Sequence, residues 1–219
     1  MSNYIAPRLN GIAEELALYV RKKIYKKTIG SLPVNEILKV VDLGVTSDKS
    51  KDSNYFEMLY PYPENITAIG LENAKYLEQI YPGLKFVYAD VCKLPFPNKT
   101  FDIGFCSAVV EHVGSLDNQL NLITEATRVS RIVVLTTPNR YFPLEFHTLT
   151  PLLHWLPKKI FRAYLSLIGK KFWSREENLN LLSDFEIVKL LEANSISYTR
   201  HHVRLFGIVS NLVYILRSE

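Results

Sequence analysis

The sequence predicts one α/β domain, built on a doubly wound parallel sheet with helices on both faces. Two observations carry this prediction. Apolar runs bounded by turn residues alternate with helical stretches from residue 37 to residue 136. Near the C-terminus, two further apolar runs follow each other with no helix between them. The 219 residues suffice for one such domain with a sizeable core, whereas two full domains would be cramped.

An amphipathic helix is expected near the N-terminus, from about Ala6 to Thr28, because apolar residues recur among charged ones at helical spacing. Gly30 and Pro33 end this helix. Residues 1–33 therefore form a helical extension of the single domain that we expect over residues 1–219.

Five strands follow in order, each a nearly continuous apolar run typical of parallel sheets that are covered on both faces. They are Ile37–Val41, Thr67–Leu71, Lys85–Ala89, Phe101–Cys106 and Arg131–Thr136. Helical stretches are expected near Ala74–Tyr81 and at Leu116–Val129. This alternation predicts βαβ units with right-handed crossovers.

The two C-terminal runs, near Ile196–Val203 and Ser210–Leu216, are joined by a short link. Such a link favours an antiparallel hairpin, because parallel neighbours need a long crossover. Between the fifth strand and this hairpin, residues 141–180 are predicted to form a helical lid that belongs to the substrate region of the same domain.

The composition excludes several classes of protein. The charge balance of +4 is mild and requires no nucleic-acid partner. Cys92 and Cys106 are too few for a disulfide framework, and the apolar runs are too short to cross a bilayer. No signal-peptide core precedes Glu14, so we expect a cytoplasmic protein.

Acidic residues stand at the ends of three successive strands: Asp42, Glu72 and Asp90. Ligands of open α/β sheets bind beyond the carboxyl ends of the strands, where carboxylates accept hydrogen bonds from a ribose diol or an adenine amino group. The turn after Asp42 lacks the glycine series that cradles a pyrophosphate. An adenosine ligand that carries positive charge therefore fits better than a dinucleotide, which disfavours a nicotinamide-dependent oxidoreductase.

A set of motifs in residues 36–140 resembles the class I S-adenosylmethionine-dependent methyltransferases. The motifs are Val41-Asp-Leu-Gly44, Gly70-Leu-Glu72, Ala89-Asp90, Leu94-Pro-Phe-Pro-Asn-Lys-Thr-Phe-Asp102 and Phe105-Cys-Ser-Ala-Val-Val-Glu-His-Val113. The last one is similar to the sub-group that includes quinone-biosynthesis methyltransferases. The resemblance implies a three-layer Rossmann-like fold with seven strands, the last one antiparallel, and S-adenosyl-L-methionine as the cofactor.

The resemblance also implies the residues that bind this cofactor. Gly44 would approach its methionine portion, Glu72 would hold the ribose hydroxyls and Asp90 would contact the adenine amino group. Ser107 would line the methionine end.

Two further positions complete the expected cofactor site, and the first loop departs from the family pattern. Asp42 would order the first loop, and Val91 would contribute backbone or packing near the adenine. The family's later glycines of the first loop are replaced by residues 45–47, valine, threonine and serine. Either a side chain crowds the cofactor, or hydroxyl and carboxyl hydrogen bonds give this loop a different path.

A hydroxyl acceptor must lose its proton during methyl transfer, and histidine or glutamate can take it. Glu111 and His112 follow the fourth strand and are the first candidates, with a capping role as the alternative. His147 is the second candidate base. Some quinone-type relatives bind a divalent metal through Glu-x-x-Glu-His, but Ala108 replaces the first glutamate here, so we expect no metal.

Residues 146–175 contain six basic and no acidic residues, interleaved with aromatic and aliphatic ones. This pattern is typical of a helix that lies on an anionic membrane, which would mean peripheral contact at the inner membrane face. An ordinary lid helix that packs on the core, with solvated lysines, is the favoured interpretation, and membrane contact is the alternative.

The sequence therefore predicts an enzyme that methylates a small-molecule or lipid-linked acceptor at oxygen. A non-catalytic interaction module that keeps the fold is the alternative, motivated by the altered first loop. The acceptor and the oligomeric state stay open.

Overall fold

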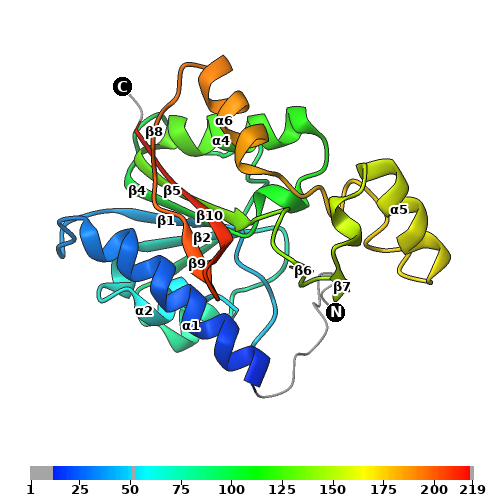
Figure 1. Cartoon of the computed structure of the whole chain (residues 1–219). Helices are drawn as coiled ribbons and strands as arrows, with labels where there is room; N and C mark the ends of the chain where they lie inside the picture. Colours follow the sequence, from blue (N-terminus) through cyan, green and yellow to red (C-terminus); the bar gives the residue numbers. More distant parts are fainter. Residues whose placement is uncertain (1–11, 51–52, 218–219) are drawn as a thin grey trace.

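The computed structural model describes residues 12–50 and 53–217, and its centre is one mixed sheet (Figure 1). The strand order is β3-β2-β1-β4-β5-β10-β8, with β9 paired to β10. The strands are β1 (Val40–Leu43), β2 (Ile66–Gly70), β3 (Lys85–Tyr88), β4 (Phe101–Ser107), β5 (Ser130–Pro138), β8 (Ser197–Arg200), β9 (Val203–Leu205) and β10 (Ile208–Arg217). β1 to β5 pair in parallel, and β10 is antiparallel to both β5 and β8. The predicted doubly wound sheet with an antiparallel last strand is confirmed.

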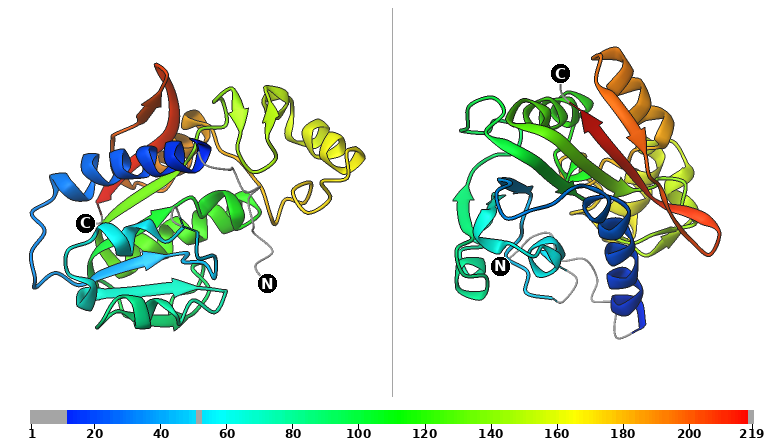
Figure 2. Two further views of the ribbon diagram at one scale, coloured as in Figure 1. Left: turned by 90° about the horizontal axis from the view of Figure 1, so that it is seen from below. Right: turned by 90° about the vertical axis from the view of Figure 1, so that its left-hand side faces the viewer.

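Helices cover both faces of this sheet (Figures 1 and 2). One face carries α4 (Leu116–Val129) and α6 (Asp184–Ala193), and the other carries α1 (Ile12–Lys27), α2 (Tyr55–Leu59) and α3 (Leu77–Ile80). Short 3₁₀ turns are η1 (Ile29–Ser31), η2 (Pro63–Asn65), η3 (Val110–His112) and η4 (Leu153–Trp155). The result is the three-layer arrangement that the strand and helix pattern predicts.

A lid projects from the sheet between β5 and α6 (Figure 1). It contains the two-stranded hairpin of β6 (Leu144–Glu145) and β7 (Thr150–Pro151), followed by η4 and α5 (Lys158–Leu167). Phe161 and Leu165 of α5 are buried against Trp173 and two leucines of the returning chain. The lid therefore has a small hydrophobic core of its own.

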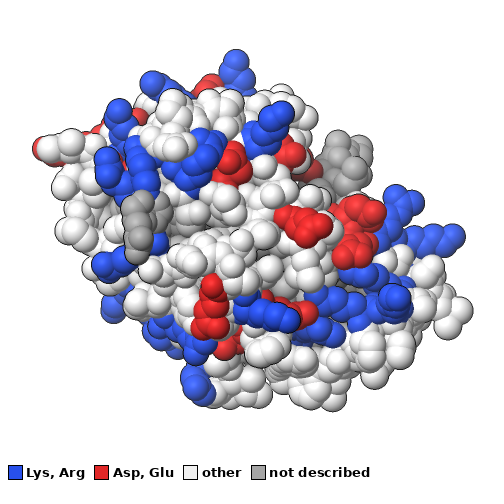
Figure 3. Space-filling view, turned by 90° about the horizontal axis from the view of Figure 1, so that it is seen from above, with Lys and Arg blue, Asp and Glu red and all other residues white. Residues whose placement is uncertain are grey.

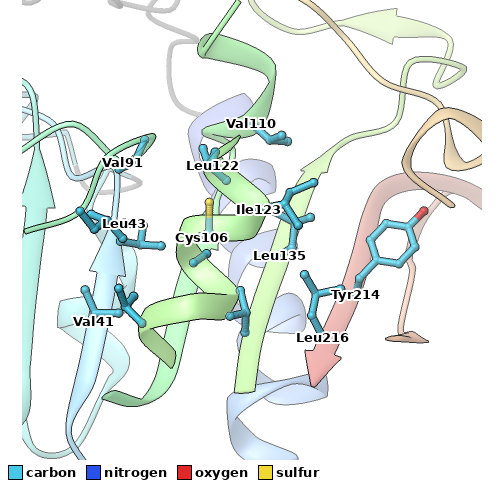
Figure 4. Packing of buried hydrophobic residues seen from close by; sticks show 14 of the residues in the cluster. Val41, Leu43, Val91, Cys106, Val110, Leu122, Ile123, Leu135, Tyr214 and Leu216 are labelled. Carbon is cyan, nitrogen blue, oxygen red and sulfur yellow. The ribbon is translucent and has the colours of Figure 1, made fainter. Parts of the chain in front are cut away.

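The main core lies between the sheet and the helices α4 and α6 (Figure 4). Leu43 of β1, Cys106 of β4 and Leu135 of β5 meet Leu122 and Ile123 of α4 there, all less than 2% exposed. On the opposite face, Phe56 of α2 stacks on Phe105 with ring centroids 4.5 Å apart. Burial on both faces explains why these strands are continuous apolar runs.

Two sequence expectations need correction. The first strand was expected at Ile37–Val41, but Ile37 is 80% exposed and β1 starts at Val40, so the buried run includes Asp42. The helices α2 and α6 were not expected as separate elements. In α6 the capping-box residues Ser183 and Glu186 mark the start of the helix.

The N-terminal helix is confirmed from Ile12 to Lys27, and the expected start near Ala6 lies outside the described residues. Within the residues that the structure covers, no helix is both long and apolar enough to cross a membrane.

Candidate active site

The first loop, residues 44–48, begins where β1 ends and packs closely on the segment after β4. Gly44 has φ +97°, and a Cβ atom built on it would lie 2.3 Å from Cγ2 of Val109. A side chain at this position would therefore clash, in addition to the strain of a left-handed backbone. Val109 directly precedes η3, so Gly44 holds the first loop against the turn that carries Glu111 and His112.

Hydrogen bonds to side chains give this glycine-poor loop its path. The Thr46 amide donates to Asn54 Oδ1 at 3.0 Å, and Asn54 Nδ2 donates back to the Thr46 carbonyl at 2.9 Å. The Ser47 amide and hydroxyl both donate to Glu72 Oε2, at 3.0 and 2.7 Å. Asp48 Oδ1 accepts from the Ser50 amide at 3.0 Å. Side-chain hydroxyl, carboxyl and amide groups therefore hold this loop, and a path different from that of the family stays a prediction.

The role expected of Asp42 is not what the structure shows. Asp42 is 7% exposed, and its carboxyl group lies beside the Glu57 carboxyl group of α2 and accepts from the Leu43 amide. Burial raises the pKa of Asp42 to about 7, and burial together with the Asp42 charge raises the pKa of Glu57 well above its usual range. This buried carboxyl pair beneath the loop therefore holds a proton more tightly than exposed carboxyl groups do. Among the described residues, Asn54 and Glu72 order the loop in place of Asp42.

Glu72 and Asp90 lie at the same edge of the sheet, as expected, because β2 and β3 pair with Gly70 opposite Tyr88. Asp90 is exposed and accepts from the Cys92 amide at 2.8 Å. A cavity of about 340 Å³ adjoins this edge. It is lined by Ser47, Lys49, Asn73, Lys75, Tyr76, Glu78 and Gln79. An adenosine moiety between Glu72 and Asp90 would lie beside polar side chains.

Val91 and Ser107 have different surroundings. The Val91 side chain is 5% exposed and packs in the main core, so it faces away from solvent. Ser107 ends β4 and is half-buried, with its hydroxyl 2.9 Å from the hydroxyls of both Tyr55 and Thr136. Three hydroxyl groups, from α2, β4 and β5, thus form a chain.

The three expected acid–base residues converge, although 35 positions separate His112 from His147. One ligand atom each of Glu111, His112 and His147 lies within 4.8 Å of the others. His112 Nε2 is 3.2 Å from His147 Nε2 and 3.9 Å from Glu111 Oε1. The ring of Trp173 lies over this group, 5.1 Å from the His147 ring.

Neighbouring groups decide which nitrogens of the two histidines carry protons. A backbone carbonyl only accepts, so the 2.7 Å contact with the Asn178 oxygen requires an N–H at His112 Nδ1. Burial lowers the pKa of His112 to about 3, which leaves His112 neutral and its Nε2 an acceptor. The proton between the two Nε2 atoms therefore belongs to His147.

A buried carboxylate supports that charge on His147. Its Nδ1 donates to Glu145 Oε1 at 2.7 Å, and Glu145 Oε2 accepts from the Thr148 amide and hydroxyl. Burial opposes the charge on His147, but Glu145 raises its pKa above the ordinary value. Although burial favours the neutral acid, the His147 charge lowers the pKa of Glu145 to about 2.

Glu111 is the third member of the group and is completely buried. Burial raises the pKa of its carboxyl group to about 7. Oε2 accepts from the Thr137 hydroxyl at 2.9 Å, whereas Oε1 has no hydrogen-bond partner among the described residues. The cluster therefore contains one buried oxygen whose demand for a partner is unmet.

Sequence reasoning missed several residues that build the site. Tyr55 bonds to Ser107, Asn54 holds the first loop, and Asn178 sets the His112 tautomer. The first two lie at the start of α2, which has only five residues and therefore shows no helical periodicity in the sequence. No local pattern points to Asn178, which meets His112 only through the return of the lid.

A family model that describes a methyltransferase domain matches residues 55–132. No curated protein matches the sequence. Among solved structures, magnesium protoporphyrin IX methyltransferase from Synechocystis PCC 6803 with bound SAH has a TM-score of 0.57 at 15% identity, covering 98% of this chain and 91% of that chain. A SAM-dependent methyltransferase from Methanosarcina mazei has a TM-score of 0.55 at 16% identity, covering 87% and 97%.

A protein from Pyrococcus horikoshii OT3 has a TM-score of 0.60 at 12% identity, covering 98% of this chain and 95% of that one. At these identities the structural likeness establishes the fold. The family match indicates a methyltransferase domain at residues 55–132, whereas the quinone-biosynthesis sub-group stays a prediction. The chain therefore has a methyltransferase domain, on a fold that it shares with S-adenosylmethionine-dependent methyltransferases.

Proposed function

We propose that the chain is an enzyme with S-adenosyl-L-methionine as its cofactor. It transfers the methyl group of this cofactor to a hydroxyl oxygen of a small-molecule or lipid-linked acceptor. The observation that carries this proposal is the contact between Gly44 and Val109. It puts the loop expected to hold the methionine end of the cofactor beside the turn with Glu111 and His112. A hydroxyl acceptor bound there would meet both the methyl group and an acid–base cluster.

In this proposal Glu72 and Asp90 hold the adenosine portion, and Gly44 and Ser107 hold the methionine portion. The Ser47 hydroxyl now donates to Glu72. Ribose hydroxyls would replace this donor, since both are neutral O–H groups that a carboxylate accepts. Asp42 supports the site from below, beside the buried carboxyl group of Glu57.

Proton removal is assigned to the cluster of Glu111, His112 and His147. Each member is buried or half-buried, and each has a partner that holds its orientation. A hydroxyl acceptor must lose the proton on its oxygen, whereas a carbon or nitrogen acceptor has less need of a group that removes a proton from oxygen. The cluster is therefore what favours oxygen in this proposal.

The lid supports a lipid-linked acceptor through its apolar surface more than through its charge. Leu167 is 85% exposed and Ile160 is 54% exposed. Of the basic residues, Lys158 pairs with Glu186 at 3.1 Å, and Arg162 pairs with Glu176 at 3.0 Å. On the face in Figure 3, basic and acidic side chains likewise lie beside each other.

A non-catalytic module is the second candidate, because the Ser47 hydroxyl already donates a hydrogen bond to the Glu72 carboxylate that is expected to bind the ribose. Calorimetric titration of the full chain with S-adenosylmethionine separates the two. We expect binding by the wild type and roughly 10–100-fold weaker binding by Glu72→Gln, since a hydrogen bond to a charged group contributes about 1.5–3 kcal/mol. Glu36→Gln, at an exposed site away from the sheet edge, is the control. Absence of binding by the wild type would favour the non-catalytic module.

Binding alone does not identify the acceptor. Incubating a cell extract with the enzyme and methyl-labelled S-adenosylmethionine, followed by mass spectrometry, locates the labelled product. A label on oxygen supports the proposal, and a label on carbon or nitrogen contradicts it.

A further inference from the structure

Glu111, His112 and His147 form a buried group of ligand atoms. The proton between the two histidines leaves one oxygen of this group, Glu111 Oε1, without a partner among the described residues. The three side chains come from η3 and from the lid, and the lid hairpin brings His147 to the other two. The expectation that no metal is needed counted only Glu111 and His112 as ligands. The structure supplies a third.

The oxygen Oε1 of Glu111 is the first observation that points to a ligand. Glu111 is completely buried, and this oxygen has no hydrogen-bond partner in the described part of the chain. A buried acceptor without a donor costs about 1–3 kcal/mol. Oε1 lies 3.9 Å from His112 Nε2, so one cation between them would interact with both atoms.

The outer nitrogens of both histidines provide the second observation. His112 donates from Nδ1 to the Asn178 carbonyl, and His147 donates from Nδ1 to the Glu145 carboxylate. Histidines that bind metals almost always donate their other ring N–H to a carbonyl or a carboxylate, which directs the remaining nitrogen at the metal. Here both remaining nitrogens are Nε2, and they face each other at 3.2 Å.

The spacing of these atoms fits a metal ion. Nitrogen and oxygen ligands bind zinc at about 2.0–2.2 Å, which separates two neighbouring ligands by roughly 3.0–3.5 Å. The 3.2 Å between the nitrogens lies in this range, and the 3.9 Å to Glu111 Oε1 needs a small movement of one carboxylate. The proton now held between the nitrogens would give way to the cation.

We propose that Glu111, His112 and His147 bind a divalent transition-metal cation of the zinc, cobalt, iron or manganese type. Two imidazoles favour these ions over magnesium and calcium, which prefer oxygen ligands. Three protein ligands leave at least one coordination position open, where an acceptor hydroxyl or water can bind. The role in catalysis rests on the proposed function, whereas cation binding does not.

Cobalt titration of the full metal-free chain tests the site, because Co²⁺ bound to histidine has a distinct visible absorption. We expect one Co²⁺ per chain in the wild type. His147→Ala should weaken binding more than tenfold, and Glu145→Gln, which removes the negative charge that supports His147, by about 10–100-fold. His201→Ala, a histidine on the sheet edge away from the cluster, is the matched control and should bind as the wild type does.

Circular dichroism of each variant shows whether it is folded. Folded His147→Ala or Glu145→Gln that binds Co²⁺ as tightly as the wild type overturns the site, and so does a wild type that binds none. Loss of Co²⁺ binding in both variants supports the site even if no methyl transfer is found. Failure of the proposed function can therefore be told apart from failure of the metal site. The first appears as missing oxygen methylation in the labelling experiment, and the second as missing Co²⁺ binding in the titration.

Discussion

Gly44 shows how one residue connects the first loop to the cluster of Glu111, His112 and His147 that we propose for acid–base chemistry. Its backbone lies at φ +97°, and the side chain of Val109 occupies the space that a Cβ atom would need. The sequence contains few glycines in this turn, yet the one that remains stands where the contact requires it. Residues 45–47 tolerate side chains because Val45 points into the core, while Thr46 and Ser47 are held by hydrogen bonds.

We expect Gly44→Ala to lower the free energy of unfolding by about 2–5 kcal/mol, since overpacking and left-handed strain add. Binding of S-adenosylmethionine should weaken as well, because the loop must shift. Urea unfolding and calorimetry measure the two effects. Adding Val109→Ala should recover part of the stability by removing the clash. A double variant no more stable than Gly44→Ala would contradict this account.

The pair of Asp42 and Glu57 makes stability depend on pH. Their pKa values are raised in the folded protein, Asp42 to about 7, mainly by burial. Between about pH 4 and pH 7 the folded state therefore binds more protons than the unfolded state, and the free energy of unfolding falls as pH rises. The loss is roughly 2–4 kcal/mol, at about 1.4 kcal/mol for each pKa unit.

Glu57→Gln should flatten this decline, because the amide donates to Asp42 without a proton that can be lost. At pH 8 the variant should be more stable than the wild type. Urea unfolding at several pH values between 4 and 8 checks this, with the exposed Glu36→Gln as control. Curves for Glu57→Gln and the wild type that run parallel would exclude the pair as the cause.

The location of a single residue was predictable from the sequence where the residue directly follows a strand. Glu72 and Asp90 reach one edge because parallel strands end there. The meeting of His112 with His147 was not predictable, although each was a candidate. It depends on where the lid hairpin turns, and on Glu145 and Asn178, which lie far from η3 in the sequence.

Elements were predictable to the extent that their pattern is local. The strands β2, β4 and β5 are mostly buried and appear as apolar runs, and α4 has an apolar stripe with a Ser115 cap. The helix α2 has only five residues and is held by Phe56, which stacks on Phe105 of β4. Helices this short depend on tertiary packing, so periodicity does not reveal them.

The lid is the part of the molecule that would contact a membrane surface. Its exposed apolar residues Ile160 and Leu167 lie on α5, next to the exposed Lys159. We expect the wild type to co-sediment with vesicles that contain anionic lipid, and the double variant Ile160→Ser/Leu167→Ser to do so several-fold less, because less apolar surface enters the interface. Ile37→Ser, at an 80% exposed residue away from the lid, should bind as the wild type does. Equal sedimentation of all three proteins would count against membrane contact.

At the scale of the whole molecule, the sheet divides into a ligand side and a far side. The proposed cofactor residues follow β1 to β4, whereas β8 forms the opposite edge, beyond β5 and β10. Both β3 and β8 pair on one side only, and most of their residues are partly or fully exposed. Such edges open locally more often than the central strands do.

Hydrogen exchange of the full chain can separate these two edges. A cofactor at 100 times its dissociation constant stabilises the bound state by about 2.7 kcal/mol, so local openings that break the site should slow by roughly 100-fold. We expect this slowing in the first loop at 44–48 and from Lys85 to Asp90, but not in β8, whose opening leaves the cofactor bound. In Glu72→Gln the difference between the two edges should shrink. Equal slowing in β8 would show that both edges open together, which contradicts a local connection between the cofactor and the edge formed by β3.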